Sequence, residues 1–242
     1  LDLEPEHLSC YGLKVEEGTP LFRMQSTLDL PDDDLQADMY LWAVACLAER
    51  GYAQYEISNF AKPGFASRHN LKYWLLEEYA GFGPGAHSDF GDVRYAYVRD
   101  LEGYCRGVTE GADMIAENER IPPRKRDLEY LMLGLRLTRG IEKREFENRF
   151  RLPFAPIQAV LERFRETGHA AQTDGRWLLT PEGFLLSNQI IGQVLEALGQ
   201  EKLRTFIRDV KNVCSEQLAM LELLPELPME EPAPLPVPAV PV

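Results

Sequence analysis

The spacing of apolar residues predicts alternating strands and helices over roughly the first 120 residues. Loose alternation predicts strands over 8–15, 52–57 and 79–83. Residues 32–50 predict a helix with one buried stripe, made of Leu35, Met39, Ala43, Cys46 and Leu47. Strand, helix and strand in this order predict a parallel α/β unit.

Beyond about residue 120 the pattern changes to closely spaced helices. Apolar positions predict three of them, over 128–135, 142–150 and 155–167. The pair Asp174-Gly175 between two short strands is a strong signal for a type I′ hairpin. Thr180 followed by Pro181 predicts the start of another helix, with an N-cap and a first-turn proline. Three helices and a hairpin predict a winged-helix-like module.

The end of the chain carries a different composition. An amphipathic pattern covers about 201–222, and seven prolines occur in the last 18 residues. Such a proline density excludes helix and sheet ladders and predicts a disordered, polyproline-like tail. We therefore expect four parts: an α/β part over 1–120, a helix-rich module over 121–200, a helix over 201–224 and a proline-rich tail over 225–242.

The charge of the chain argues against a nucleic-acid partner. The formal net charge is −13, and it reaches −9 within residues 1–60. An acidic chain gains no general attraction to a phosphate backbone. The helix predicted over 155–167 carries Glu162, Arg163, Arg165 and Glu166, so its charges balance. We expect the winged-helix-like module to cover the α/β part rather than to bind DNA.

The cysteine spacing and the hydropathy of the chain indicate in which cellular compartment it occurs. Cys10, Cys46, Cys105 and Cys214 match neither an iron–sulfur ligand spacing nor a disulfide framework, which favours free thiols in a reducing cytoplasm. No apolar run approaches the ~20 residues of a membrane span. The first residues also lack the features of a signal peptide and resemble the interior of a longer chain.

Residues 55–88 hold the densest group of glycines, histidines and aromatic residues. If Gly81, Gly83 and Gly85 lie on a strand, they share one face without side chains, which a ligand or another backbone could approach. A tight turn is an equally open alternative. The stretch also matches the dinucleotide fingerprint G-x-G-x-x-A, but residues 88–92 predict a turn where that fingerprint needs a helix.

His69 is the candidate metal ligand. If residues 69–74 are helical, His69 and Tyr73 share a face and Trp74 lies beside them. A neutral imidazole can ligate haem iron, and flat rings suit a porphyrin. An ordinary histidine among core aromatic residues is the alternative. Glu56 is expected to pair with Lys62 or Arg68, and no second carboxylate or nucleophile motif predicts a catalytic residue.

Several motifs together resemble one known family. Residues 55–61 read YEISNFA, residues 69–74 read HNLKYW and residues 81–88 read GFGPGAHS. These resemble the HemW-type haem chaperones, radical S-adenosylmethionine (SAM) relatives of oxygen-independent coproporphyrinogen III oxidase. The likeness extends over about residues 1–200. It implies the C-terminal part of a partial TIM-like radical SAM barrel, followed by the oxidase-like C-terminal, winged-helix-like domain.

The resemblance also implies ligands and their residues. In this family the motif HNxxYW is associated with haem, which here implies His69, Asn70, Tyr73 and Trp74, with His69 on the iron. More loosely, it implies that a SAM pocket is bordered by Tyr11, Gly12, Leu13, Gly83, Gly85, Ala86 and His87. Haem would pass to recipient haem proteins, some of them in the membrane. Porphyrin synthesis by a coproporphyrinogen oxidase is the alternative.

One part of the family pattern is missing. The family holds a [4Fe–4S] cluster with a CxxxCxxC motif, and this chain contains no such motif. We therefore expect no Fe–S ligands in this chain, and expect SAM and [4Fe–4S] only in a full-length protein. The simplest interpretation is a C-terminal fragment that is inactive as an enzyme on its own.

Overall fold

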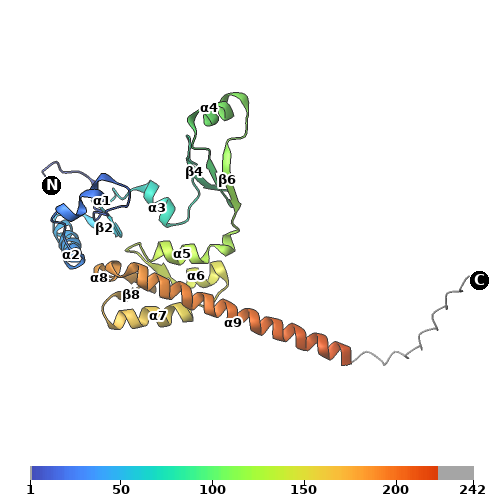
Figure 1. Ribbon diagram of the computed structural model, residues 1–242. Helices are drawn as coiled ribbons and strands as arrows, with labels where there is room; N and C mark the ends of the chain where they lie inside the picture. The colour runs from blue at the N-terminus through green and yellow to red at the C-terminus, as the bar shows by residue number, and fades with distance from the viewer. Residues whose placement is uncertain (1, 223–242) are drawn as a thin grey trace, which may run out of the picture. The chain divides into compact units, whose positions relative to one another are not determined.

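The computed structural model of the protein describes residues 2–222, with side chains described as far as residue 208 (Figure 1). Residues as far as Leu198 form one compact unit. The described residues form three separate three-stranded sheets, and every strand pair in them is antiparallel. The α/β composition is confirmed, whereas the predicted parallel unit is wrong. The predicted tail over 225–242 lies outside the described residues.

The first sheet has the order β1-β3-β2. Its strands are β1 (His7–Ser9), β2 (Ala53–Glu56) and β3 (Asn59–Ala61). Only residues 57 and 58 connect β2 to β3, whereas a parallel connection needs about a dozen residues or more. Strand β3 therefore folds back as a hairpin and separates β1 from β2. The strand predicted over 8–15 is correct only as far as Ser9.

Side-chain caps begin the two main helices of this region. The Asp32 carboxylate accepts a hydrogen bond from the Leu35 amide at 2.8 Å and begins α2 (Asp33–Glu49). The Ser67 hydroxyl accepts one from the Asn70 amide at 3.3 Å and begins α3 (Arg68–Trp74). Helix α1 (Pro20–Met24) and the 3-10 turn η1 (Gln25–Thr27) precede α2.

The buried stripe predicted along α2 is mostly wrong. Only Leu47 of that stripe is buried, while 51% of Leu35 and 55% of Met39 are exposed. The reason is that α2 packs by its last turns, where Leu47 meets Tyr52 and Phe60 in a small apolar cluster. In the first half of the helix Tyr40 packs against the larger hydrophobic core, while Leu35 and Met39 stay exposed.

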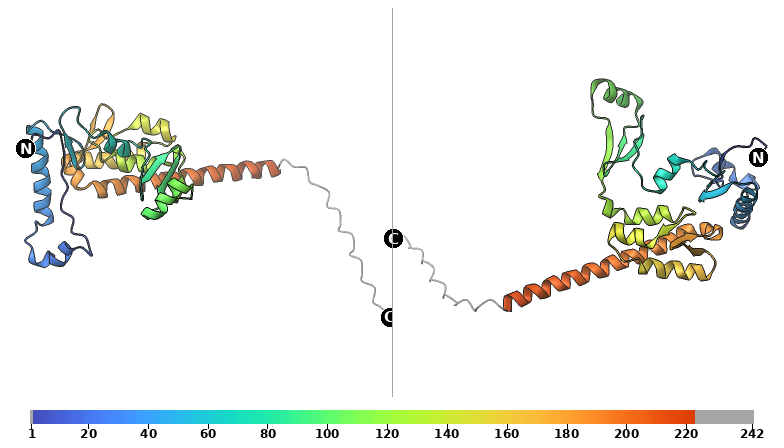
Figure 2. Two further views of the ribbon diagram at one scale, coloured as in Figure 1. Left: turned by 90° about the horizontal axis from the view of Figure 1, so that it is seen from above. Right: turned by 180° about the vertical axis from the view of Figure 1, so that it is seen from behind.

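The second sheet was not predicted from the sequence. It contains β4 (His87–Phe90), β5 (Val93–Tyr97) and β6 (Ile115–Arg120), in that order, with α4 (Leu101–Glu110) between β5 and β6; all are green in Figure 2. The strand predicted over 79–83 is wrong, because only Tyr79 makes a bridge, to Asp89.

The glycines of residues 81–85 form a turn instead of a strand face. Gly83 has φ 109° and Gly85 has φ 70°, both in the region that glycine occupies most readily. This backbone cannot alternate with a period of two, so the three glycines do not line one sheet face. Of the turn predicted over 88–92, only residues 91 and 92 form a turn, since residues 88–90 belong to β4.

Residues 121–200, which were predicted to form a helix-rich module, follow their local signals closely. Asp174 and Gly175 have φ 51° and 79°, as a type I′ hairpin requires, and the Thr180 hydroxyl accepts from the Gly183 amide. A third sheet of order β7-β9-β8 lies among the helices. The elements are η2 (Pro123–Lys125), α5 (Asp127–Gly134), β7 (Ile141–Glu142), α6 (Lys143–Phe150), α7 (Ala155–Glu166), β8 (Ala170–Thr173), β9 (Arg176–Leu179), α8 (Pro181–Leu185) and α9 (Ser187–Glu222).

This module holds the larger hydrophobic core. Trp177, Phe146 and Phe154 are fully buried, and Ile190 from the first turns of α9 joins them. Both views of Figure 2 show the yellow helices beside the orange start of α9. Helix α9 begins at Ser187, so the separate helix predicted over 201–222 is the continuation of a longer one.

Two seams fasten this module to the preceding residues. In the first, Asp89 in β4 accepts hydrogen bonds from both terminal nitrogens of the buried Arg126 at 2.5 and 2.6 Å, and from Arg94 at 3.2 Å. Arg94 also holds Glu129 of α5 through two bonds of 2.9 Å. Although burial alone would raise it, the pKa of Asp89 is held below its ordinary value by the hydrogen bonds from Arg126 and Arg94.

The second seam is formed by main-chain hydrogen bonds. The Ile57 amide donates to the Arg136 carbonyl at 3.0 Å, and the Thr138 amide donates to the Tyr55 carbonyl at 3.2 Å. Glu56 and Leu137 form an antiparallel bridge between these two bonds. The segment after α5 therefore continues the pairing of β2.

Candidate functional site

The four residues of HNLKYW divide between two faces of α3. His69 and Tyr73 are four residues apart and both exposed, so they lie together on the outer face. Asn70 and Trp74 are also four residues apart, and both are partly buried. Residues 69–74 are helical, as part of α3, and this geometry separates a surface pair from an anchoring pair.

The two side chains of the surface pair contact each other directly. The His69 Nε2 and the Tyr73 hydroxyl lie 3.0 Å apart and form a hydrogen bond. Their rings meet edge to face, with centroids 4.9 Å apart, and Tyr73 in turn contacts Tyr79 at 4.5 Å. The imidazole is thus held in one orientation on an open face. Both side chains are exposed, so neither His69 nor Tyr73 lies in a core, and the alternative of an ordinary histidine without a ligand stays open.

The anchoring pair contacts two different parts of the chain. The Asn70 side chain hydrogen-bonds Tyr55, whose hydroxyl also lies 2.8 Å from the Nε2 of His7. Trp74 lines a small cavity together with Tyr130 and Leu137 of the helix-rich module. Because one face of α3 is fixed in this way, the position of the other face is fixed as well.

The residues predicted to border a SAM pocket fall into two groups. Tyr11, Gly12 and Leu13 line a cavity of about 790 Å³, closed on one side by Gln36 and Met39 of α2. Of the exposed apolar side chains on the first half of α2, Met39 therefore borders this cavity.

The second predicted group does not line that cavity. Gly83, Gly85 and Ala86 belong to the turn before β4, which is held by the bond from the Gly83 amide to the Tyr104 hydroxyl at 3.0 Å. His87 begins β4 and is exposed. The structure thus brings Tyr11, Gly12 and Leu13 together in a cavity but leaves the glycine turn outside it.

Glu56 is buried, but without the ion pair predicted for it. Its carboxylate accepts hydrogen bonds from the Asn59 side chain and from the Ser58 amide, while the Lys62 ammonium group donates to the Glu4 carbonyl. Burial raises the pKa of Glu56, and the hydrogen bonds from Asn59 and Ser58 oppose that rise. The expected pairing with Lys62 or Arg68 is therefore wrong.

Two further cavities were not predicted from the sequence. One, of about 940 Å³, adjoins the first cavity through shared residues such as Tyr40, and its other lining residues include Arg136, His169 and Asn188. These residues are far apart along the chain, so no local motif could have grouped them.

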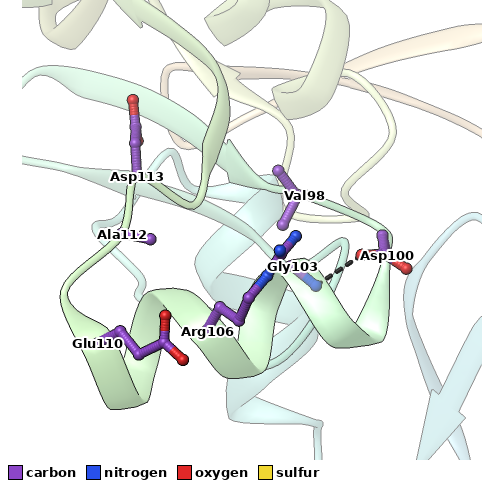
Figure 3. Close-up of a pocket in the computed structure, with 7 residues that line it drawn as sticks. All are labelled: Val98, Asp100, Gly103, Arg106, Glu110, Ala112 and Asp113. Carbon is purple, nitrogen blue, oxygen red and sulfur yellow. Dashed lines mark hydrogen bonds between the residues drawn. The ribbon is translucent and has the colours of Figure 1, made fainter.

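The other cavity, of about 410 Å³, lies beside α4 (Figure 3). Asp100 caps this helix by accepting from the Gly103 amide at 2.6 Å, and Arg106 and Glu110 follow along the same helix. None of the predicted haem or SAM residues lines this cavity.

The remaining chemical features are few in the described part of the chain. Cys10, Cys46 and Cys105 are free thiols. Over residues 2–208, whose side chains are described, no three histidine, cysteine or acidic side chains gather as a metal site. No helix within the described residues is long and apolar enough to cross a membrane.

Comparison with known proteins identifies the relatives of the chain. Residues 121–186 match the family model of the HemN C-terminal domain. The heme chaperone HemW of Bacillus subtilis is 34% identical over 201 residues, which are 82% of this chain and 53% of that protein. HemW of Lactococcus lactis is 33% identical over 81% of this chain and 52% of its own length. The chain thus spans about half the length of the relatives it matches.

A solved structure shares the fold. Coproporphyrinogen III oxidase (HemN) from Escherichia coli, described as a radical SAM enzyme, matches 80% of this chain and 48% of its own with a TM-score of 0.58. The sequence identity is 18%, so this likeness concerns the fold alone. The resemblance indicated by the motifs is confirmed: the chain carries a HemN C-terminal domain and is similar over most of its length to HemW-type haem chaperones.

Proposed function

We propose that the chain is the haem-binding part of a haem chaperone, and that the outer face of α3 binds the haem. The arrangement of HNLKYW carries this proposal: Asn70 and Trp74 fix the helix, and His69 and Tyr73 present an imidazole and a flat ring to an open face. Curated relatives named heme chaperone HemW support the choice of ligand.

The residues present fit a haem. An exposed histidine can supply an axial nitrogen to iron, and an aromatic ring beside it can lie against the macrocycle. Here the Tyr73 hydroxyl occupies the His69 Nε2, so ligation through that nitrogen requires Tyr73 to move aside. Bound haem would supply the iron and the cargo, while this chain supplies the ligand, the adjoining ring and the rigid support.

The experiment is a Soret titration of the chain with haem. His69→Ala is expected to weaken haem binding by about tenfold or more, because the axial ligand is lost. Arg68→Ala, an exposed change on the same helix outside the motif pair, is the matched control. Equal affinity of both variants and the wild type would remove His69 as the ligand and overturn the proposed site.

We extend the proposal to the architecture of the chain and to the activity of a full-length protein. We infer that residues 1–120 are the C-terminal part of a radical SAM barrel, with Tyr11, Gly12 and Leu13 at its SAM pocket, and that residues 121–200 form a winged-helix-like cover. The order α5-β7-α6-α7-β8-β9 supports the second inference. A full-length protein would pass haem to recipient haem proteins. If a product assay showed that the full-length protein forms protoporphyrinogen, the oxidase alternative would be favoured instead.

A further inference from the structure

Arg136 differs from Arg126 and Arg176, which pair with carboxylates, and from Arg149, which lies over the rings of Tyr130 and Phe150. Arg126 is paired with Asp89, and Arg176 lies 3.5 Å from the carboxylate of Glu142. Arg136 is also partly buried, yet no carboxylate of the described residues lies within salt-bridge distance of it. Burial alone lowers the pKa of Arg136. An arginine that loses water without gaining a counter-ion carries a free-energy cost that an anionic ligand would offset.

The position of Arg136 suits a binding role. Its carbonyl accepts from the Ile57 amide in the main-chain seam, so its backbone is fixed. Its two terminal nitrogens donate to the Met132 carbonyl at 3.1 Å and to the Asn188 side chain at 3.0 Å. A guanidinium has five N–H donors, so these two bonds orient the group and leave other donors unused.

The unused donors lie beside a large cavity. Arg136 lines the cavity of about 940 Å³, which adjoins the one bordered by Tyr11 and Leu13. Phe184 and Leu186 add apolar lining, His169 adds a polar group, and Asp33 and Glu182 add carboxylates that form no salt bridge with Arg136. Among the described lining residues Arg136 is the one Arg or Lys, and its unused donors match a ligand that ends in a carboxylate.

We propose that Arg136 is the anchor for a ligand carboxylate in this cavity. Two sources of that group follow from the ligands considered above, a propionate of haem or the carboxylate of SAM. The choice of these two candidate ligands rests on the proposed function. The location of the carboxylate site does not, since neither His69 nor Tyr73 lines this cavity.

The test compares Arg136→Gln with Arg139→Gln in the 242-residue chain. Arg139 is exposed, lies three residues away and does not line the cavity, so it controls for the loss of one charge. Arg136→Lys retains the positive charge, so it should bind the ligand more tightly than Arg136→Gln does. Such a recovery would show that the loss of affinity in Arg136→Gln is not caused by misfolding. Haem is titrated by its Soret band, and SAM by equilibrium dialysis.

The two sources give different results. If a propionate binds, Arg136→Gln weakens haem binding by about tenfold or more, while haem dimethyl ester binds the variant and the wild type equally. If SAM binds, its affinity falls by a similar factor and that of 5′-methylthioadenosine, which has no carboxylate, stays the same.

Failure of this inference is distinguishable from failure of the proposed function. Haem and SAM affinities that are equal in Arg136→Gln and Arg139→Gln would overturn the carboxylate site and leave the His69 result standing. A wild-type chain that binds SAM but not haem would overturn the proposed haem site, and the SAM titration alone would then decide the role of Arg136. Binding of neither ligand would overturn both.

Discussion

Replacing Asp89 by asparagine should destabilise the chain strongly. The change removes the carboxylate partner of Arg126, which is 6% exposed and donates hydrogen bonds to both carboxylate oxygens of Asp89. Leaving one member of a buried pair unpartnered costs about 3–5 kcal/mol. Arg94 retains its two bonds to Glu129, so its loss of Asp89 adds little. In a unit of this size such a loss lowers the Tm by about 6–20 °C.

Urea denaturation at neutral pH measures this loss, with two comparisons. Glu162→Gln breaks the exposed pair with Arg165 and should cost less than about 1 kcal/mol. The double variant Asp89→Leu with Arg126→Met replaces the pair by apolar groups and should recover much of the stability, because no charge remains buried without a partner.

The pH dependence provides a second check on the same pair. The folded state lowers the pKa of Asp89, so the carboxylate stabilises the fold above its unfolded pKa of about 3.9, and this contribution is lost as the pH falls through the lowered folded value. The gap between wild type and Asp89→Asn should therefore narrow in acid. A loss below about 1 kcal/mol, or an equal gap at about pH 3 and pH 7, would refute the reasoning.

Three other changes have expected outcomes that the same urea assay checks. Because burial raises the pKa of Glu56, the folded state binds the proton of this carboxyl more tightly than the unfolded state does. The wild type should therefore gain stability relative to Glu56→Gln as the pH falls through that raised pKa. A difference in unfolding free energy between the two proteins that does not change with pH would contradict this. Gly81→Ala should cost about 1–3 kcal/mol, because the new Cβ would lie 2.3 Å from the His87 carbonyl oxygen. Gly192→Ala, with nothing within 4 Å, should instead stabilise α9 by about 0.5–1 kcal/mol, and the opposite ranking would show that these contacts do not govern stability.

Features with local causes could be predicted from the sequence. The hairpin at Asp174-Gly175 and the cap at Thr180 depend on residues at most three positions apart. The helix over 69–74 and the shared face of His69 and Tyr73 follow from a spacing of four. In each case the determining contact lies within one turn of the chain.

Features with distant causes could not be predicted. Strand direction in the first sheet depends on β3 pairing with both β1 and β2, and β1 lies about 50 residues away from β3. The exposure of Leu35 depends on what covers α2, which its own periodicity does not state. The grouping of Arg136, His169 and Asn188 around one cavity depends on the tertiary fold of the module. Binding residues brought together in this way leave no pattern of spacing in the sequence.

The main-chain seam between β2 and the segment after α5 affects how this region can evolve. Its two bonds join the Ile57 amide to the Arg136 carbonyl and the Thr138 amide to the Tyr55 carbonyl, so they are indifferent to most changes of side chain. Many substitutions at these positions leave the seam intact. An inserted or deleted residue would instead shift the pairing and turn the Arg136 side chain away from its cavity. Length, more than residue identity, is the property that selection must hold constant here.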